Sequence, residues 1–135
     1  MTQASEEAAH FYRLAADEAD AQAQNNLGDM HYNSQGATQS YEEAARYYRL
    51  AADQGHAEAQ NQLGRMYSNG RGVTQSYEKA VRSYRLSAEQ GNAQGQYNLG
   101  DMHYEGKGTS QSSKEATRYR RLAARQALAA AHTNP

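Results

Sequence analysis

The residues of this sequence whose types could do chemistry are two glycine-rich loops and two histidines. The segments Gly70-Arg71-Gly72 and Gly106-Lys107-Gly108 combine glycines with a basic side chain, as a phosphate-cradling loop does. His31 and His103 are candidates for metal ligation or general-base catalysis. A phosphate loop needs a preceding strand and longer glycine spacing, however, and neither histidine has a second ligand at metal-binding spacing. We therefore interpret the loops as structural turns and the histidines as packed side chains.

No other arrangement typical of catalysis stands out. We find no grouping of Ser, His and Asp and no pair of carboxylates placed for acid–base work. The sequence has no Cys, which excludes disulfide scaffolds, zinc fingers, thiol nucleophiles and iron–sulfur ligation. We therefore predict that the protein is not an enzyme and that it uses no metal and no cofactor.

The composition favours closely packed helices. The 135 residues are rich in Ala and Tyr, contain a single Pro and carry a formal net charge of −1. A charge this close to zero argues against a dedicated nucleic-acid binder. No apolar run approaches the roughly 18 residues that a membrane span needs, and the first residues lack a signal-peptide pattern. The compartment therefore stays open, with the cytoplasm slightly favoured.

A repeat of 36 residues organises the chain. Leu-Gly pairs that begin at Leu27, Leu63 and Leu99 recur at this interval. Each unit contains two amphipathic segments separated by a glycine-containing turn, which predicts two helices per unit. One such hairpin cannot bury its apolar face alone, so neighbouring units stack and share a core. The predicted fold class is an all-α, right-handed α/α solenoid (superhelix) of tandem helix-turn-helix repeats, with a single domain over residues 1–135.

The ends of the chain depart from the regular unit. The predicted units are 1–20, 21–56, 57–92 and 93–132. The first is a half repeat that holds only a second helix, at about residues 5–18. In the last unit Ala127 replaces the glycine that stops the second helix elsewhere. We therefore expect one long C-terminal helix over about residues 113–131.

Local signals support the helix boundaries and the packing. Ser40 with Glu43, and Ser112 with Glu115, have the spacing of capping boxes at the start of second helices. Glycines recur in the middle of each first helix, beginning with Gly28, where glycine costs up to about 1 kcal/mol relative to Ala. A helix accepts that cost where a neighbouring helix approaches closely.

One motif in the second full unit carries a family resemblance. The pattern Ala-x-Ala-Gln-x-x-Leu-Gly-x-Met-Tyr-x-x-Gly-x-Gly-Val is followed by Tyr-Glu-Lys-Ala and by Tyr-x-Leu-x-Ala-x-Gln-Gly within residues 57–91. This pattern resembles the Sel-one-like repeat family, a branch of the tetratricopeptide-type solenoids. The resemblance covers essentially the whole chain. It implies an adaptor whose repeats build a superhelix with an inner surface that recognises other proteins.

From this resemblance we expect a protein-interaction module that binds a peptide or protein segment of unknown identity on the concave face of the first helices. Amide side chains offer both donors and acceptors to a peptide backbone, and Tyr97 is an aromatic anchor. A polar face that is merely solvated is the alternative. The candidate binding residues are Asn25, Asp29, Glu58, Asn61, Gln62, Arg65, Gln94, Tyr97, Asn98 and Asp101.

Charge is distributed unevenly along the chain, with acidic residues in excess over 1–30 and basic residues in excess over 106–135. This favours an alternative function, a structural repeat element that associates head-to-tail with copies of itself. Binding of nucleic acid or an anionic surface is a third possibility, for which only one short segment is basic. The candidate end-to-end contacts are Glu6, Glu7, Arg118, Arg120, Arg121 and Arg125.

A line of leucines also follows the 36-residue period. Its members are Leu14, Leu50, Leu86 and Leu122. These side chains either pack between neighbouring helices or form an exposed apolar line that marks a partner surface. Because solenoid helices often pack on two sides, we expect the leucines to be packed.

Overall fold

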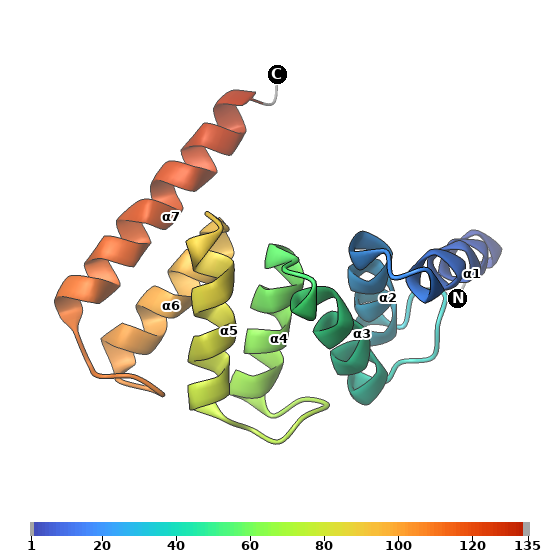
Figure 1. Ribbon diagram of the computed structural model, residues 1–135, viewed down its shortest axis with the longest axis horizontal. Coiled ribbons are helices and arrows are strands. Elements are labelled where there is room, and N and C mark those ends of the chain that lie inside the picture. Colours follow the sequence, from blue (N-terminus) through green and yellow to red (C-terminus); the bar gives the residue numbers. More distant parts are fainter. Residues whose placement is uncertain (1, 134–135) are drawn as a thin grey trace.

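The computed structural model describes residues 2–133 and contains, within them, seven helices and no strand. The helices follow one another in a curved row (Figure 1). They are α1 (Gln3–Asp17), α2 (Ala21–Asn33), α3 (Tyr41–Asp53), α4 (Ala57–Asn69), α5 (Tyr77–Glu89), α6 (Ala93–Glu105) and α7 (Ser113–Thr133). This is an all-α superhelical repeat, as the 36-residue period predicts.

The helices alternate between two positions in the repeat. We call α2, α4 and α6 the A helices, and each of them packs most closely on the B helix that follows it, α3, α5 or α7. α1 occupies the B position of the half repeat. α4 and α6 touch one another directly, whereas within the described part of the chain no comparable contact joins α3 to α5. The A helices therefore lie on the inner side of the curve.

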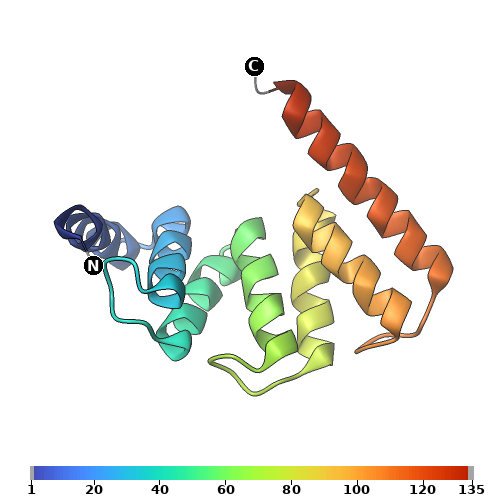
Figure 2. The same ribbon diagram turned by 180° about the vertical axis from the view of Figure 1, so that it is seen from behind.

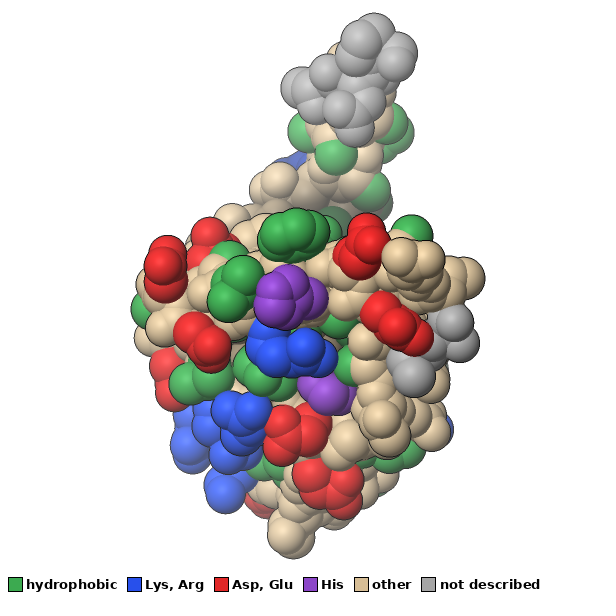
Figure 3. Space-filling view, turned by 90° about the vertical axis from the view of Figure 1, so that its right-hand side faces the viewer, with side chains coloured by type: hydrophobic (Ala, Val, Ile, Leu, Met, Phe, Trp, Pro, Cys, Tyr) green, Lys and Arg blue, Asp and Glu red, His purple; other side chains and the backbone are tan. Residues whose placement is uncertain are grey.

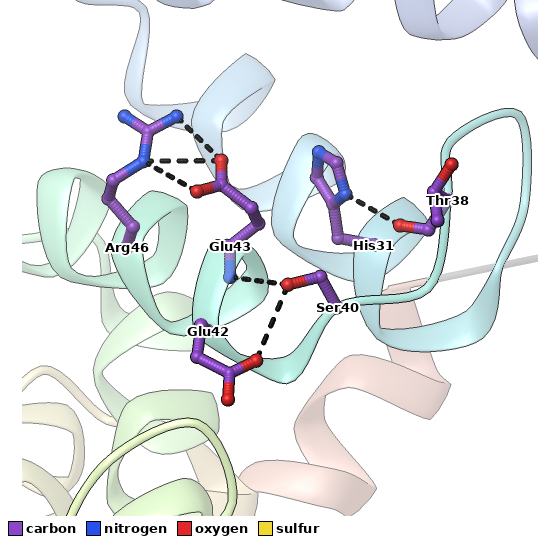
Figure 4. A network of polar contacts seen from close by, with 6 residues as sticks. All are labelled: His31, Thr38, Ser40, Glu42, Glu43 and Arg46. Carbon is purple, nitrogen blue, oxygen red and sulfur yellow. Dashed lines mark hydrogen bonds and ion pairs between the residues drawn. The ribbon is translucent and has the colours of Figure 1, made fainter.

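The B helices begin at serine caps. The Ser40 hydroxyl accepts a hydrogen bond from the backbone N–H of Glu43 at 3.1 Å (Figure 4). The predicted capping box is only half formed, because the Glu43 carboxylate pairs with Arg46 at 2.8 Å. The backbone N–H of Ser40 has another acceptor, the carbonyl oxygen of His31 at 3.0 Å. The same exchange recurs in the last unit, where Ser112 caps α7 and Glu115 pairs with Arg118.

Glycines set how closely the helices approach. A Cβ atom on Gly28 would lie 2.5 Å from the ring of Tyr48, and one on Gly64 would lie 2.7 Å from the ring of Tyr84. The prediction that these glycines admit a neighbouring helix is therefore confirmed. In the loop after α4, Gly72 has a φ of +73° and lies against the backbone carbonyl of Tyr41 in the preceding unit. The glycine loops are structural turns that hold successive units together.

Small, aromatic and sulfur-containing side chains form cores between a B helix and the A helix that follows it. Between α3 and α4, Tyr48, Leu63 and Met66 pack with Ala44 and Ala45, and all five are buried. Alanines let the helices approach closely enough for the tyrosine rings to fill the remaining space. The core is thin but continuous from unit to unit.

The line of leucines is exposed, and the expectation that it is packed is wrong. The exposed fractions of Leu14, Leu50 and Leu86 are 53%, 41% and 48%, and Leu122 is half-buried. These leucines point away from the A helices, which lie on the opposite side of the B helices. Packing between B helices would require the B helices to touch one another, and they lie too far apart.

The last B helix is longer than the others. α7 ends at Thr133, two residues beyond the predicted boundary, and extends past the end of α6 (Figure 2). The glycines that end α3 and α5 have positive φ angles, +88° at Gly55 and +83° at Gly91. Ala127 stands at the equivalent position, and there the helix continues.

Candidate functional site

The inner side of the curve is a polar surface made by the three A helices. Polar side chains recur there because positions facing neither the B helix nor the next A helix remain open to solvent. Most of the predicted binding residues lie on this surface. Glu58, Arg65, Gln94 and Tyr97 are exposed, whereas Asp29, Gln62, Asn98 and Asp101 are half-buried.

Two predicted binding residues do not lie on this surface. The exposed fractions of Asn25 and Asn61 are 0% and 2%, so the expectation that they line the concave face is wrong. Asn61 is covered by the next A helix, because its Oδ1 accepts a hydrogen bond from Asn98 at 2.8 Å. Its amide also donates to Gln94 at 3.4 Å. Asn61 therefore joins two neighbouring A helices, whereas the buried amide of Asn25 has no hydrogen-bond partner among the described residues.

Tyr97 occupies the same repeat position as Asn61, but no further A helix covers it among the described residues. It stands one repeat after Asn61, but no A helix follows α6 within the described residues, and its side chain is 51% exposed. An exposed ring beside amide side chains is the kind of anchor that dominates protein interfaces.

A small hollow of about 180 Å³ lies between α2 and α4. The Tyr48 hydroxyl donates to Asp29 Oδ1 at 2.5 Å on one side, while Arg65 and Arg71 line the hollow from α4 and the loop after it. Burial raises the pKa of the Asp29 carboxyl above its ordinary value, and the hydrogen bond from Tyr48 opposes that rise. Arg71 donates to the Tyr32 hydroxyl at 2.6 Å and so links two units.

A larger groove of about 660 Å³ lies where α6 meets α7. We call it the α6–α7 groove. Tyr97 stands on the α6 side and three alanines of α7 form the opposite wall. Arg65 reaches the groove from α4, so it lines both this groove and the small hollow. The lining residues are Arg65, Ala93, Gln94, Tyr97, Asn98, Arg120, Ala123, Ala124 and Ala127.

Arg120 of α7 lines this groove. It was expected to take part in an end-to-end contact, but its guanidinium donates to Asp101 Oδ1 at 2.8 Å. Arg120 stands at the repeat position of Tyr48 and Tyr84, whose side chains point toward their own A helix. The hydrogen bond with Asp101 raises the pKa of Arg120. The role of Arg120 as an end contact stays a prediction.

The two histidines pack against tyrosines. His31 stacks on Tyr47 with ring centroids 5.6 Å apart, and its Nδ1 lies 3.0 Å from the carbonyl oxygen of Thr38 (Figure 4). His103 is buried and stacks in the same way on Tyr119 at 5.8 Å. Both histidines therefore fill the A–B interface, as predicted. In the part of the chain described, no three His, Asp or Glu side chains gather as a metal site.

The sequence of the repeat unit identifies the protein family. The family profile of the Sel1 repeat matches residues 2–20, 21–56, 57–92 and 93–128, nearly the whole chain. The chain belongs to the Sel1 repeat family. Sel1 repeat proteins are generally scaffolds for protein interaction, and their fold is of a scaffold type and not an enzyme type. No helix described here is long and apolar enough to cross a membrane.

Solved structures of Sel1 repeat proteins have the same arrangement. One is c5321, a protective antigen of uropathogenic Escherichia coli with an SLR fold, at 35% identity and a TM-score of 0.85 over 90% of this chain and 26% of that one. Another is a Sel1 repeat protein from Oxalobacter formigenes, at 36% identity and a TM-score of 0.77 over 81% of this chain and 45% of that one. Cysteine-rich protein B of Helicobacter pylori, at 24% identity and a TM-score of 0.66, shares the fold over 87% of this chain and 90% of its own. This chain therefore spans less than half of the first two proteins. Among curated proteins none matches it.

Sequence reasoning missed several residues of the Sel1 repeat inner surface. Arg71 was assigned to a structural turn, and the alanines of α7 were assigned to a helix without a site. The signal for α7 was available, because Ala127 in place of the stop glycine predicts a longer wall beside α6. The signal for Arg71 was weaker, since only the three-dimensional stacking of units brings its side chain to Tyr32.

The two ends of the described Sel1 repeats carry opposite charge. On α1, Glu6 and Glu7 are exposed beside Phe11, whose exposed fraction is 65%. Figure 3 shows this end of the molecule, where acidic side chains lie beside exposed hydrophobic ones. On the outer side of α7, Arg121 and Arg125 are exposed around a hollow of about 590 Å³. Arg118 lines that hollow too and pairs with Glu115 at 2.9 Å.

Proposed function

We propose that this chain is a protein-interaction scaffold that binds a peptide or protein segment on the inner surface of α2, α4 and α6. One observation carries the proposal. Arg65 joins the small hollow at Asp29 to the α6–α7 groove at Tyr97, so a single bound segment can contact all three residues in sequence.

The chemistry of this surface suits a peptide. Gln94 and Asn98 present amide groups that both donate and accept hydrogen bonds, as an extended backbone requires. Tyr97 offers a large ring at low cost in conformational entropy. Arg65 contributes a planar guanidinium that binds a carboxylate in a bidentate manner.

Selection from a random peptide library displayed on phage tests this proposal. Peptides selected on the wild-type chain are then titrated against the double variant Arg65→Glu/Tyr97→Ala. We expect that variant to lose binding by about a thousandfold, since two residues at the centre of an interface each contribute about 2 kcal/mol. The matched control is Arg82→Glu/Leu86→Ala, which makes the same charge reversal and also truncates an exposed hydrophobic side chain, on the outer side of α5.

The outcomes separate the two sides of the molecule. Equal binding to the wild type and the control supports the proposal when the inner variant fails. Selected peptides that bind the inner variant as tightly as the wild type, or a library that yields no binder, would overturn it.

We also propose head-to-tail association of copies of this chain as a second candidate function. The supporting observation is the opposite charge of α1 and α7 together with the exposed ring of Phe11. Glu6 and Glu7 would face Arg121 and Arg125 of the next copy, and such a contact weakens as salt screens the charges.

Sedimentation velocity at low and high salt measures this association. Both Glu6→Lys/Glu7→Lys and Arg121→Glu/Arg125→Glu should remain monomeric at low salt when each is studied alone. A mixture of the two variants should associate again, because both the unaltered ends and the altered ends of the two variants carry opposite charges. A wild-type chain that stays monomeric at high concentration and low salt contradicts this second function.

A further inference from the structure

We propose that the α6–α7 groove binds an acidic α-helix of a partner protein that has small residues on its contact face. The bound helix occupies the place that an additional A helix of the solenoid would take. This inference rests on the proposed scaffold function and specifies the form of the bound segment. It follows from comparing the two walls of the groove with the equivalent positions in the other units.

The α6 wall presents a position that a following A helix covers elsewhere. Asn25 and Asn61 are both buried, and Asn61 is bonded to α6, whereas Tyr97 at the same position is 51% exposed. The contact that buries Asn61 comes from Gln94 and Asn98 of the next A helix. The Tyr97 ring therefore faces the space that a further A helix would fill.

The α7 wall shows the same pattern independently. Ala16 and Ala88 are 7% and 6% exposed on α1 and α5 and Ala52 is half-buried on α3, while Ala124 at the equivalent position of α7 is exposed. Ala127 is exposed beside it and lines the groove with it. The α7 wall thus continues the contact between a B helix and the next A helix, which occurs three times among the described residues, and the α6 wall continues the contact that joins α4 to α6.

The established interface also dictates the face of the occupant. Where α6 packs on α5, a Cβ on Gly95 would lie 2.7 Å from the Cβ of Ser87, and the position equivalent to Gly95 in α4 is Ala59, fully buried. Only Gly or Ala fits between two helices at this distance. A helix seated against Ala123 and Ala124 therefore needs small residues on its contact face.

One hydrogen bond that joins an A helix to the preceding B helix in the other units cannot form in the groove. In the other units a buried glutamine of the A helix donates to a carbonyl near the end of the preceding B helix, as Gln96 does to Ala88 at 3.3 Å. The carbonyl of Ala124 lies inside a continuous helix and is used by helical hydrogen bonding. The occupant therefore has no use for that glutamine, which separates it from a copy of the repeat.

Charge completes the description of the occupant. Arg65 hydrogen-bonds to Gln62 at 3.0 Å and forms no ion pair among residues 2–133. Arg120 lies at the same end of the groove, where Asp101 already neutralises it. An acidic side chain on the occupant would therefore pair with Arg65.

A synthetic helix provides the probe. The peptide has the sequence of residues 20–34 with a lactam bridge between positions 28 and 32, and Gln24 is replaced by Ala. In the intact chain Gly28 packs against Tyr48 of α3, so the bridge lies away from the expected contact. The peptide is acidic and carries Ala23 at the buried small position. Its matched control replaces Ala23 by Leu.

The peptide is titrated into the isotope-labelled full chain and followed by the backbone amide resonances in NMR. We expect saturable shifts at Tyr97, Ala124 and Ala127, and affinity about tenfold lower or worse for the Leu control, because overpacking costs this much. Ala124→Gln and Arg65→Glu should each weaken binding by a similar factor. Thr117→Gln, with the same new side chain on the outer side of α7, should have no effect.

Three outcomes would overturn the proposal. They are absence of binding at millimolar peptide, shifts confined to residues outside the groove, and equal loss with Ala124→Gln and Thr117→Gln. If a library peptide still binds through Arg65 and Tyr97 while the helix does not, the scaffold function stands and only the helical occupant fails. If the library fails as well, both proposals fall.

Discussion

The hairpin of α4 and α5 and the hairpin of α6 and α7 share one sequence pattern but differ in what their B helices do. In the first, the ring of Tyr84 covers Gly64 and belongs to the buried core. In the second, Arg120 stands at that position and turns toward Asp101 on the inner surface. The ring of Tyr84 therefore stays in the buried core, whereas the side chain of Arg120 lines the groove.

The C-terminal ends of the same helices differ through one residue. Beyond α5, Gln90 lies outside the helix and donates to Gln60 at 2.6 Å, as Gln54 does to Gln24 one unit earlier. In α7 the equivalent Gln126 stays within the helix, and Gln96 Oε1 is buried with no hydrogen-bond partner among the described residues. Where a stop glycine is present, the helix ends and the glutamine before it forms a hydrogen bond to the neighbouring unit. Where the glycine is absent, the helix continues.

The largest effect is expected where two units meet. Gly72→Ala places a side chain at a φ of +73° and against the carbonyl of Tyr41. We expect a loss of about 2–4 kcal/mol from the left-handed backbone and the overlap together. Urea denaturation followed by far-UV circular dichroism measures it.

Gly55→Ala is the matched control for Gly72→Ala. Its φ of +88° is equally unfavourable, but no atom lies within 4 Å of the added Cβ. The loss should therefore fall to about 1–2 kcal/mol, the cost of the backbone conformation alone. Equal losses for the two variants would show that the contact with Tyr41 contributes nothing.

The second effect tests the two hairpins directly. Gly64→Ala brings a Cβ to 2.7 Å from the Tyr84 ring, whereas in Gly100→Ala the nearest atom, the Ala116 carbonyl oxygen, lies at 3.2 Å. We expect Gly64→Ala to lose about 1–2 kcal/mol and Gly100→Ala to stay within about 1 kcal/mol of the wild type, because Ala improves helix propensity. Thermal unfolding of both variants checks this, and a Gly100→Ala loss as large as that of Gly64→Ala contradicts it.

The third effect concerns helix length more than stability. Ala127→Gly introduces the stop residue of the other units, and α7 should then end near Gln126 as α5 ends near Gln90. We expect less helical circular dichroism and a new hydrogen bond between Gln126 and Gln96. A far-UV spectrum and the Gln96 side-chain amide resonances report the two changes. An unchanged spectrum would mean that packing, and not residue 127, sets the end of α7.

The sequence predicts most of this fold because the repeat is encoded residue by residue. The first and last helices were expected at 5–18 and 113–131 and are found within two residues of those bounds, since each unit repeats the same pattern and the glycine that stops α3 and α5 is missing from α7. Burial at the inner surface depends instead on what lies beside a residue. Asn61 and Tyr97 occupy the same position in their units, and only the presence of a following A helix makes one buried and the other exposed.

The smallest expected effect is a change of stability with pH, and it depends on whether a carboxylate faces a neutral or a charged partner. Asp29 faces the neutral hydroxyl of Tyr48, whereas Asp101 faces the cationic Arg120. Because burial raises the pKa of Asp29, the folded state holds the proton more tightly than the unfolded state does. The stability from this group is fully present below its ordinary pKa of 3.8 and is lost as the pH rises through the higher folded value.

Asp29→Asn should therefore gain stability relative to the wild type as the pH rises from below 3.8 toward neutrality. Glu43→Gln is the contrasting variant, because the Arg46 guanidinium lowers the pKa of Glu43 and the contribution of that group is present above its ordinary pKa of 4.5. Its deficit relative to the wild type should grow over the same range of rising pH. Urea denaturation of the three proteins across that range gives the two slopes. Slopes of the same sign would mean that the Tyr48 hydrogen bond outweighs the burial of Asp29, and that the neutral partner stabilises the carboxylate as well as a charged one does.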